Sequence, residues 1–436
     1  MIKMKKSLFI LFILPVLAFS QHSISGTFSP AKDFKIAILY KVTPTQLVYE
    51  NHSAVDSLGN YHITIKDQAE KGMYKVVYAM PQEEYNFDVI YNNEDIEVNF
   101  QTEKGTTFIT SEENKLWQSY NKSMRLVNES LNNFFKSKSK TEANFLKLIK
   151  VQKQTQTEYE KAANNKLASN FITAKRPYFP SKFKDEATYM EEKKAHYFDH
   201  LDFKNIQLLN SNFLVEASFD YVYTFINETN VEASLKENID VLVQQIGNQN
   251  GFKNLILELL WRQFSGSKET VASYIAENYL VDIAKETQNE TLFAEIALLK
   301  QTSIGQKAPN FDIAASSLYD LNTSDFYIVA FWSSTCGHCL AEMPVLQDFV
   351  NKQPKNKIDV IAIGLESEPE FWTQKIKEFK NFTHVYGEGK WDNKIGDAYN
   401  VKSTPTFYIL NKSKEIVAKP YDVNALKNFF TESAEY

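Results

Sequence analysis

Two cysteines are the side chains whose type and spacing most clearly indicate chemistry in this sequence. Cys336 and Cys339 are the only cysteines in the chain, and Gly337 and His338 separate them. On a helix, this spacing places the second sulfur about one turn beyond the first, so the two can close and reopen a disulfide. The pair could therefore exchange electrons with another dithiol or disulfide.

The residues around the pair predict which sulfur attacks. Residues 326–332, FYIVAFW, are an apolar run typical of a buried strand, and a helix would begin where the cysteines follow. Unpaired N–H groups at a helix N-terminus stabilise an anion, so we expect the pKa of Cys336 below the free value of about 8.5. Cys336 is then the nucleophile and Cys339 the more buried resolving thiol. His338, when protonated, would add positive charge beside the thiolate and make the pair more oxidising; its alternative is an ordinary exposed histidine.

Three other uses of a cysteine pair agree less well with the sequence. A structural zinc site normally takes four ligands, and no third cysteine exists, although seven histidines keep this possibility open. Covalent haem attachment requires a histidine directly after the second cysteine, where Leu340 stands. An inert disulfide is the main alternative, although so short a loop gains less from closure than a long one.

The elements that must hold the pair form an α/β unit over residues 303–436. Strand–helix–strand, then a hairpin and a helix, predicts one compact domain. The expected elements are strand 326–332, a helix through residue 349, strand 358–365, helix 370–379, strands 406–410 and 415–418, and helix 424–430.

Two regions of different character precede this unit. Residues 21–110 contain β-branched and aromatic runs separated by turn signals, which predicts a small antiparallel β-sandwich. Residues 111–302 are poor in glycine and follow helical spacing; in residues 251–264, for example, apolar side chains recur at i, i+3, i+4 and i+7. The predicted fold class is multidomain: a β-sandwich, a helical middle region and a C-terminal α/β domain.

Residues 1–20 have the layout of a secretory signal. A positive start, MIKMKK, precedes an apolar run and the small-x-small site Ala18-Phe19-Ser20. The run is shorter than the roughly 20 residues of a membrane span, which leaves a retained anchor as the alternative, and no cysteine follows it to carry a lipoprotein anchor. We therefore expect an exported protein of the periplasm or cell envelope, associated with the membrane only if the signal is retained.

Charge and cysteine content narrow the class of protein. The chain has 48 Lys and Arg against 54 Asp and Glu, a net charge of −6, which excludes the basic field that nucleic-acid binding needs. Exported scaffolds stapled by disulfides usually contain several pairs, and this chain has one. The single pair therefore favours a redox role over a structural one.

The stretch FWSSTCGHCLAEMP, residues 331–344, resembles the active-site segment of the thioredoxin-fold family, most closely its exported TlpA/ResA-like branch of thiol–disulfide oxidoreductases. The lead-in APNF at residues 308–311 and the loop STPTF at residues 403–407 share this resemblance, which covers about residues 304–436. The segment DSLGNY at residues 56–61 looks like the β-domain that often precedes such modules in Bacteroidetes envelope proteins. The resemblance implies a thioredoxin-like domain with neither a metal nor an organic cofactor.

The resemblance also implies roles for further residues. Thr404 and Pro405 would bind substrate, because a cis bond between them leaves the preceding backbone free to pair with an incoming peptide. Glu342 would handle the proton of Cys339; its alternative is a surface acid of the helix. Trp332 is also predicted as a substrate-binding residue, although its main role would be to pack beneath the site.

The sequence departs from the family pattern at several positions. Cytosolic thioredoxins have a buried Asp where Ala330 stands here, which leaves Glu342 as the candidate proton acceptor. The Gly-His dipeptide is that of protein disulfide isomerases, so the direction of electron flow stays open. Val329 and Ser333 occupy positions where a peroxiredoxin needs proline and threonine, which argues against peroxidase chemistry.

The resulting hypothesis is an enzyme that exchanges its dithiol or disulfide with cysteine-containing envelope proteins. The resemblance favours the reductant direction, with electrons from an upstream donor. The alternative is an envelope binding protein in which the thioredoxin-like domain is a scaffold with an inert disulfide.

Overall fold

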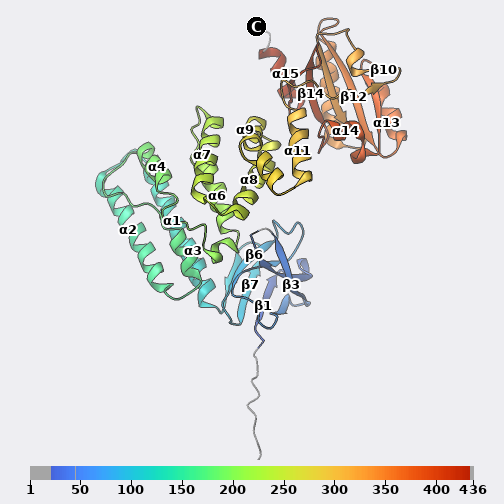
Figure 1. Cartoon of the computed structure of the whole chain (residues 1–436). Helices are drawn as coiled ribbons and strands as arrows, with labels where there is room; N and C mark the ends of the chain where they lie inside the picture. Colours follow the sequence, from blue (N-terminus) through green and yellow to red (C-terminus); the bar gives the residue numbers. More distant parts are fainter. Residues whose placement is uncertain (1–20, 45, 433–436) are drawn as a thin grey trace, which may run out of the picture. The chain divides into compact units, whose positions relative to one another are not determined.

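The computed structural model of the protein describes residues 21–44 and 46–432 (Figure 1). The predicted signal, residues 1–20, lies outside the described residues. The chain divides into two compact units between Ile256 and Leu257. Among the described residues, no helix is long and apolar enough to cross a membrane.

The first unit begins with two four-stranded sheets that share one apolar core. Their strand orders are β4-β1-β7-β8 and β3-β2-β5-β6, and β1 and β7 are the one pair among them that runs parallel. Alternating side chains such as Leu39, Tyr74, Val89 and Val98 meet between the sheets with no more than trace exposure. The strands are β1 Ser23–Ser29, β2 Ile36–Val42, β3 Leu47–Ala54, β4 Asn60–Thr64, β5 Gly72–Val77, β6 Asn86–Tyr91, β7 Ile96–Gln101 and β8 Gly105–Phe108.

Helices follow the sandwich, and polar side chains fix where they begin. Ser111 and Thr141 cap the first two helices by accepting hydrogen bonds from N–H groups three residues on. Asn114 joins the first helix to the sandwich, because its side-chain amide exchanges two 2.8 Å hydrogen bonds with the backbone of Ile90. The helices are α1 Glu112–Lys136, α2 Glu142–Ala162, α3 Ala168–Ala174, α4 Glu186–Ala195, α5 Ile206–Leu209, α6 Phe213–Thr224, α7 Val231–Ile246 and α8 Asn250–Ser265.

The second unit combines the last helices with the α/β domain. Helices α9 Glu269–Ile275, α10 Val281–Glu286 and α11 Glu290–Gln301 lead into it. Lys419 forms an ion pair with Glu269 of α9 at 3.0 Å, so these helices contact the domain that follows. Strands give way to helices between Phe108 and Glu112, and the last of these helices ends at Gln301. The division between the two compact units falls within α8.

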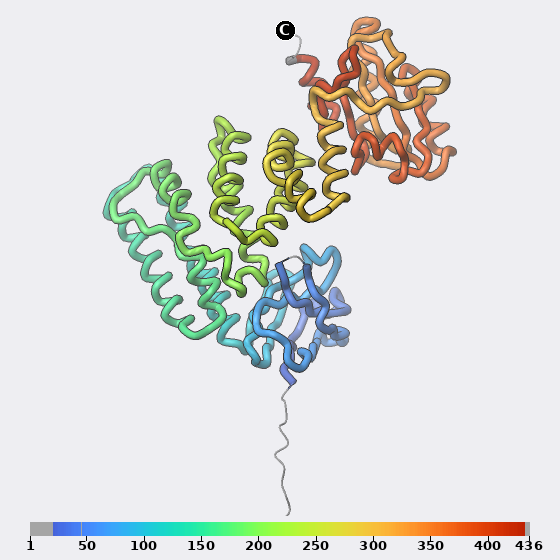
Figure 2. The backbone as a smooth tube through the Cα atoms, in the orientation of Figure 1, coloured from blue at the N-terminus to red at the C-terminus, as the bar shows by residue number. Residues whose placement is uncertain are grey.

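A five-stranded sheet with the order β13-β12-β11-β14-β15 is the centre of the α/β domain, and Figure 2 traces its chain. The strands β11, β12 and β13 are parallel, and β14 and β15 are antiparallel to their neighbours. The strands are β11 Phe326–Trp332, β12 Ile358–Glu366, β13 Thr383–Glu388, β14 Thr406–Asn411 and β15 Ile416–Ala418, with a small hairpin of β9 Asp312–Ile313 and β10 Ser316–Ser317 before them.

The central strand β11 is apolar on both sides because both faces of the sheet are covered. Tyr327, Val329 and Phe331 belong to one apolar cluster, and Ile328, Ala330 and Trp332 belong to the other. This explains the unbroken apolar run in the sequence, which is typical of parallel strands between two layers. The helices of the domain are α12 Gly337–Asn351, α13 Pro369–Lys375, α14 Lys394–Ala398 and α15 Val423–Glu432.

Candidate active site

The two cysteines lie where β11 passes into α12. Cys336 is the N-cap residue of α12, and its sulfur accepts a hydrogen bond from the backbone N–H of Cys339 at 3.3 Å. Cys336 is partly exposed, Cys339 has no exposed surface, and both are unpaired thiols. This is the predicted arrangement of an accessible sulfur with its partner buried one turn deeper.

The surroundings of the two sulfurs separate their pKa values. Burial acts to raise the pKa of Cys336, but hydrogen bonds from the side chain and backbone of Cys339 outweigh it and leave the pKa below its usual value. The side chain of Thr404 and the backbone N–H of His338 lower the pKa of Cys336 further. Burial raises the pKa of Cys339 to about 12, and its hydrogen bond to Cys336 acts in the same direction. One sulfur therefore ionises readily while the other keeps its proton.

The loop before β14 brings distant residues to the cysteines. The Cys336 thiol donates to the backbone carbonyl of Thr404 at 3.4 Å, although 68 positions separate the two residues. The peptide bond between Thr404 and Pro405 is cis, as the family resemblance implied. The antiparallel register of β11 with β14, which pairs Phe331 with Thr406, places this loop beside the end of β11. Thr404 is partly exposed and Pro405 is buried.

Trp332 does not reach the surface, so the prediction that it binds substrate is wrong. Its side chain has no exposed area and its ring packs edge-on against Phe379, with ring centroids 5.6 Å apart. It shares an apolar cluster with Cys339 because both face the same side of the sheet. Trp332 supports the site from within, while His338 is exposed between the cysteines, where its predicted electrostatic role stays a prediction.

Glu342 has a structural partner in the fold. One of its carboxylate oxygens accepts a hydrogen bond from the backbone N–H of Val423 at 2.7 Å, at the first residue of α15. A carboxylate at that place satisfies a free N–H group and complements the helix dipole. Within the described residues no hydrogen bond joins Glu342 to Cys339, so its role in proton transfer stays a prediction.

A carboxylate that the sequence analysis did not identify holds the loop in front of Cys336. Glu366 ends β12 and is 3% exposed, and it accepts hydrogen bonds from the backbone N–H of Ser334 and, at 3.2 Å, from the hydroxyl of Ser333. Parallel pairing of Trp332 with Gly364 puts the end of β12 beside this loop. An acidic residue that closes the apolar strand IDVIAIGLE was the available signal.

We expect Glu366→Ala to destabilise the chain by about 1–3 kcal/mol, because it leaves the buried N–H of Ser334 without a partner. Glu366→Gln keeps an acceptor at the same place and should lose less. Urea unfolding of the reduced full chain, followed by fluorescence, measures the difference.

Glu368→Ala is the matched control for this experiment. Glu368 is exposed two residues further on and makes no capping hydrogen bond to α13. Its removal should change stability by no more than about 0.5 kcal/mol. Equal effects of Glu366→Ala and Glu368→Ala would show that the buried contact does not stabilise the loop.

Comparison with known proteins agrees with this geometry. Residues 324–416 match a family model described as thioredoxin-like. The thiol-disulfide oxidoreductase ResA of Geobacillus kaustophilus is 25% identical over 118 residues, which cover 26% of this chain and 67% of that protein. ResA of Oceanobacillus iheyensis is 25% identical over 138 residues, which cover 29% of this chain and 70% of that protein. The C-terminal domain is thioredoxin-like, and among curated proteins it is similar to ResA thiol-disulfide oxidoreductases.

Solved structures similar to this chain come from Bacteroides and Cytophaga species. A thioredoxin-like protein from Bacteroides caccae covers 58% of this chain and 96% of its own, with 21% identity and a TM-score of 0.43. A domain of a possible thiol-disulfide isomerase from Cytophaga hutchinsonii covers 30% of this chain and 94% of its own, with 31% identity and a TM-score of 0.27. With the family-model match and the ResA relatives, the predicted enzyme class, a thioredoxin-like thiol–disulfide oxidoreductase, is confirmed.

Proposed function

We propose that this TlpA/ResA-like protein is exported and exchanges the disulfide of its Cys-Gly-His-Cys pair with cysteine-containing proteins of the cell envelope, chiefly as a reductant. The contrast between Cys336 and Cys339 carries the proposal. One sulfur is partly exposed with a lowered pKa, and the other is buried with a pKa of about 12. The secretory pattern of residues 1–20 supports the export step.

The reduction of a substrate disulfide would proceed in two exchanges. The Cys336 thiolate attacks one substrate sulfur, so that a Cys336–substrate disulfide forms, the substrate S–S bond breaks, and the released substrate thiolate takes up a proton. Cys339 then loses its proton and attacks the Cys336 sulfur, which closes the Cys336–Cys339 disulfide and releases the second substrate thiol. Two electrons pass to the substrate, and an upstream dithiol must reduce the pair again.

The positions of Thr404 and Cys339 would favour both exchanges. Thr404 lies against Cys336, so a peptide that docks on this loop would place its sulfur near the nucleophile. The high pKa of Cys339 keeps it protonated until the mixed disulfide forms, which limits premature release. The proton of Cys339 then passes to a nearby base, for which the departing substrate thiolate and Glu342 are the candidates.

Trapping tests the proposal. We expect Cys339→Ala to accumulate envelope proteins as mixed disulfides on Cys336, because the resolving sulfur is missing. Non-reducing gels and mass spectrometry of the captured adducts measure this. The double variant Cys336→Ser/Cys339→Ala is the control and should capture none. If Cys339→Ala captures no more than this control, the alternative of a binding protein on a redox-inert scaffold is favoured.

The midpoint potential of the pair tests the direction of exchange. A value near about −270 mV, as in thioredoxin, would support the reductant role. A value near about −180 mV, as in protein disulfide isomerase, would contradict it. Equilibration of the full chain with glutathione buffers, followed by thiol counting, gives the potential.

A further inference from the structure

A cavity of about 200 Å³ lies among the helices of the first unit. Its lining comes from α1, α2, the end of α3, α4, α6 and the segments that follow α3 and α4. Apolar and aromatic side chains form part of the wall, among them Pro177, Tyr189, Leu201 and Phe213. At about 30 Å³ per water molecule, the space equals six or seven waters, which suits a small ligand.

One side of the cavity is acidic. Glu216 and Asp220 are four residues apart on α6, so both point from the same face of that helix. Neither carboxylate forms a hydrogen bond or ion pair with another side chain in residues 21–44 and 46–432. Desolvation raises the pKa of Glu216, and the negative charges of Asp88 and Asp220 act in the same direction, whereas the positive charges of Lys175 and Lys75 act against it. Within that part of the chain, neither carboxylate has a cationic partner in direct contact.

The other charged side chains of the cavity are basic. Lys175 follows α3, and Lys193 lies on α4. Desolvation lowers the pKa of both lysines, and the carboxylate of Asp220 opposes this for each of them. The Lys175 ammonium donates to Asn121 at 3.2 Å, whereas Lys193 makes neither a hydrogen bond nor an ion pair within the described part of the chain.

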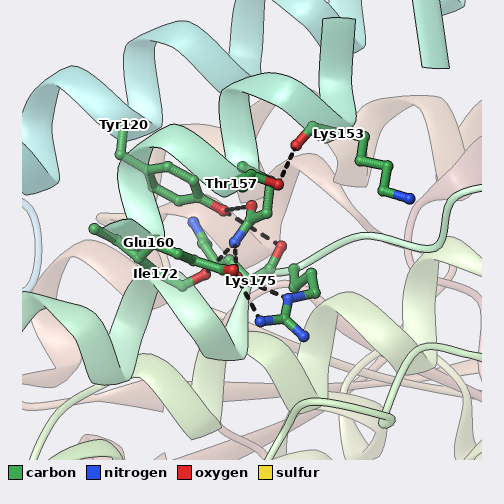
Figure 3. A network of polar contacts seen from close by, with 8 residues as sticks. Tyr120, Lys153, Thr157, Glu160, Ile172 and Lys175 are labelled. Carbon is green, nitrogen blue, oxygen red and sulfur yellow. Dashed lines mark hydrogen bonds and ion pairs between the residues drawn. The ribbon is translucent and has the colours of Figure 1, made fainter. Parts of the chain in front are cut away.

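A hydrogen-bond network fixes the segment that carries Lys175 (Figure 3). Glu160 on α2 accepts from the Arg176 guanidinium at 2.7 and 2.9 Å, so this cation already has a partner. The side-chain amide of Gln156 donates to Glu160 at 2.7 Å and to the backbone carbonyl of Ile172 at 2.9 Å. Its oxygen accepts a hydrogen bond from the Tyr120 hydroxyl at 2.8 Å. The network holds the basic wall in place without using either lysine ammonium.

The remaining basic side chain of the lining, His196, also has partners. Its ring is stacked on Tyr178 with centroids 4.5 Å apart, and its Nδ1 lies 2.7 Å from a carboxylate oxygen of Asp199. Among the described residues that line the cavity, Lys175 and Lys193 are thus the basic side chains without a carboxylate in direct contact. The cavity offers two ammonium groups from one part of its wall, two carboxylates from α6, and an apolar surface.

We propose that this cavity binds a small zwitterion with an apolar body, of the chemical class of a free α-amino acid with an apolar side chain. The ligand carboxylate would face Lys175 and Lys193, its ammonium would face Glu216 and Asp220, and its side chain would pack on the apolar wall. Lys193 is half-buried, and Lys175, Glu216 and Asp220 keep exposed surface, so a ligand can reach all four charges. A ligand with a single charge would complement only the two lysines or only the two carboxylates, whereas a zwitterion complements both pairs. This site is independent of the cysteine pair and goes beyond the proposed redox function.

Binding of L-leucine and L-phenylalanine to the full chain, measured by calorimetry, tests the proposal. N-acetyl-L-leucine lacks the ammonium group, and L-leucinamide lacks the carboxylate. We expect each analogue to bind at least about tenfold more weakly than L-leucine, since each loses charge-assisted contacts. The proposal would be overturned if either analogue bound as tightly as L-leucine. It would also be overturned if neither L-leucine nor L-phenylalanine bound at concentrations up to about 10 mM.

Variants of the lining assign the contacts. Lys193→Met and Asp220→Asn should each weaken L-leucine binding about tenfold or more, and Lys175→Met is a second test of the basic wall. Asp220→Asn should leave the weak binding of N-acetyl-L-leucine unchanged, because that analogue has no ammonium group for Asp220 to hold.

Lys194→Met is the matched control. Lys194 is the next residue of α4, but its ammonium pairs with Glu237 at 3.2 Å, and it does not line the cavity. Its replacement should leave L-leucine affinity unchanged, and circular dichroism should show folded chains for all variants. Equal effects of Lys193→Met and Lys194→Met would refute the assignment. Cys336→Ser should bind L-leucine like the unaltered chain, which separates this site from the redox centre.

Discussion

Replacement of Cys336 by serine is expected to abolish disulfide reduction by this protein. Serine keeps the size of the side chain, but its hydroxyl does not ionise near neutral pH and cannot displace a sulfur. Turnover with insulin as a disulfide substrate should fall by roughly a thousandfold or more, since Cys336 is the partly exposed thiol of the pair and lies against the loop of Thr404. Cys339 cannot replace it, because it is fully buried and has a pKa of about 12.

Cys339→Ser is the informative control for this loss. It should also stop turnover, yet it should still form one mixed disulfide per chain, because Cys336 remains. Thiol counting after a single exchange distinguishes the two variants. Activity of Cys336→Ser above background would mean that the oxidoreductase reaction uses another group, and the assigned order of attack would then be wrong.

Alkylation of the reduced full chain by iodoacetamide should modify Cys336 and spare Cys339. At pH 7 a thiol with a pKa of about 12 is ionised in roughly one molecule in 100,000, against about 3% for a free cysteine. The reaction requires the thiolate, so we expect Cys339 to react roughly three-thousandfold more slowly than free cysteine. Peptide mass spectrometry after timed quenching gives both rates.

The pH dependence of the two rates has a defined sign. The pKa of Cys336 is lowered, so its rate should rise with pH to a plateau, with a midpoint below the value of about 8.5 for free cysteine. The rate of Cys339, whose pKa is raised, should continue to rise toward pH 12. In urea, where neither sulfur has its native neighbours, the rates should become equal. A midpoint for Cys336 at or above that of free cysteine would contradict its role as the activated sulfur.

Several elements could be predicted because their signals are local. The apolar run of β11 and the helix that starts at the cysteines come from neighbouring residues, and the structure has both at Phe326–Trp332 and Gly337–Asn351. The strands β1, β3 and β8 did not stand out in the sequence. β3, LVYENHSA, is a polar edge strand with no fully buried side chain, so its structure depends on pairing with β2 rather than on its own pattern.

Glu342 and Glu366 show, near the site, the same difference between local signals and contacts made by tertiary structure. Glu342 attracts notice because it follows the cysteines in sequence, yet its observed contact is the start of α15. Glu366 lies 32 positions from Ser334 and reaches it through the pairing of β11 with β12. Likewise, Trp332 directly precedes the loop of the cysteines but faces the interior of the domain. Proximity in sequence does not indicate which backbone group a side chain reaches.

By itself, the sequence determined the reactive pair, its place at the start of a helix and the α/β character of the domain around it. These properties depend on interactions within about one helical turn or along one strand. Only the tertiary structure decided that Thr404 lies against Cys336, that Glu366 holds the loop before it, and that Lys193 and Asp220 line one cavity. Those contacts join residues far apart in the chain, and the packing of whole elements, rather than any local preference, brings them together.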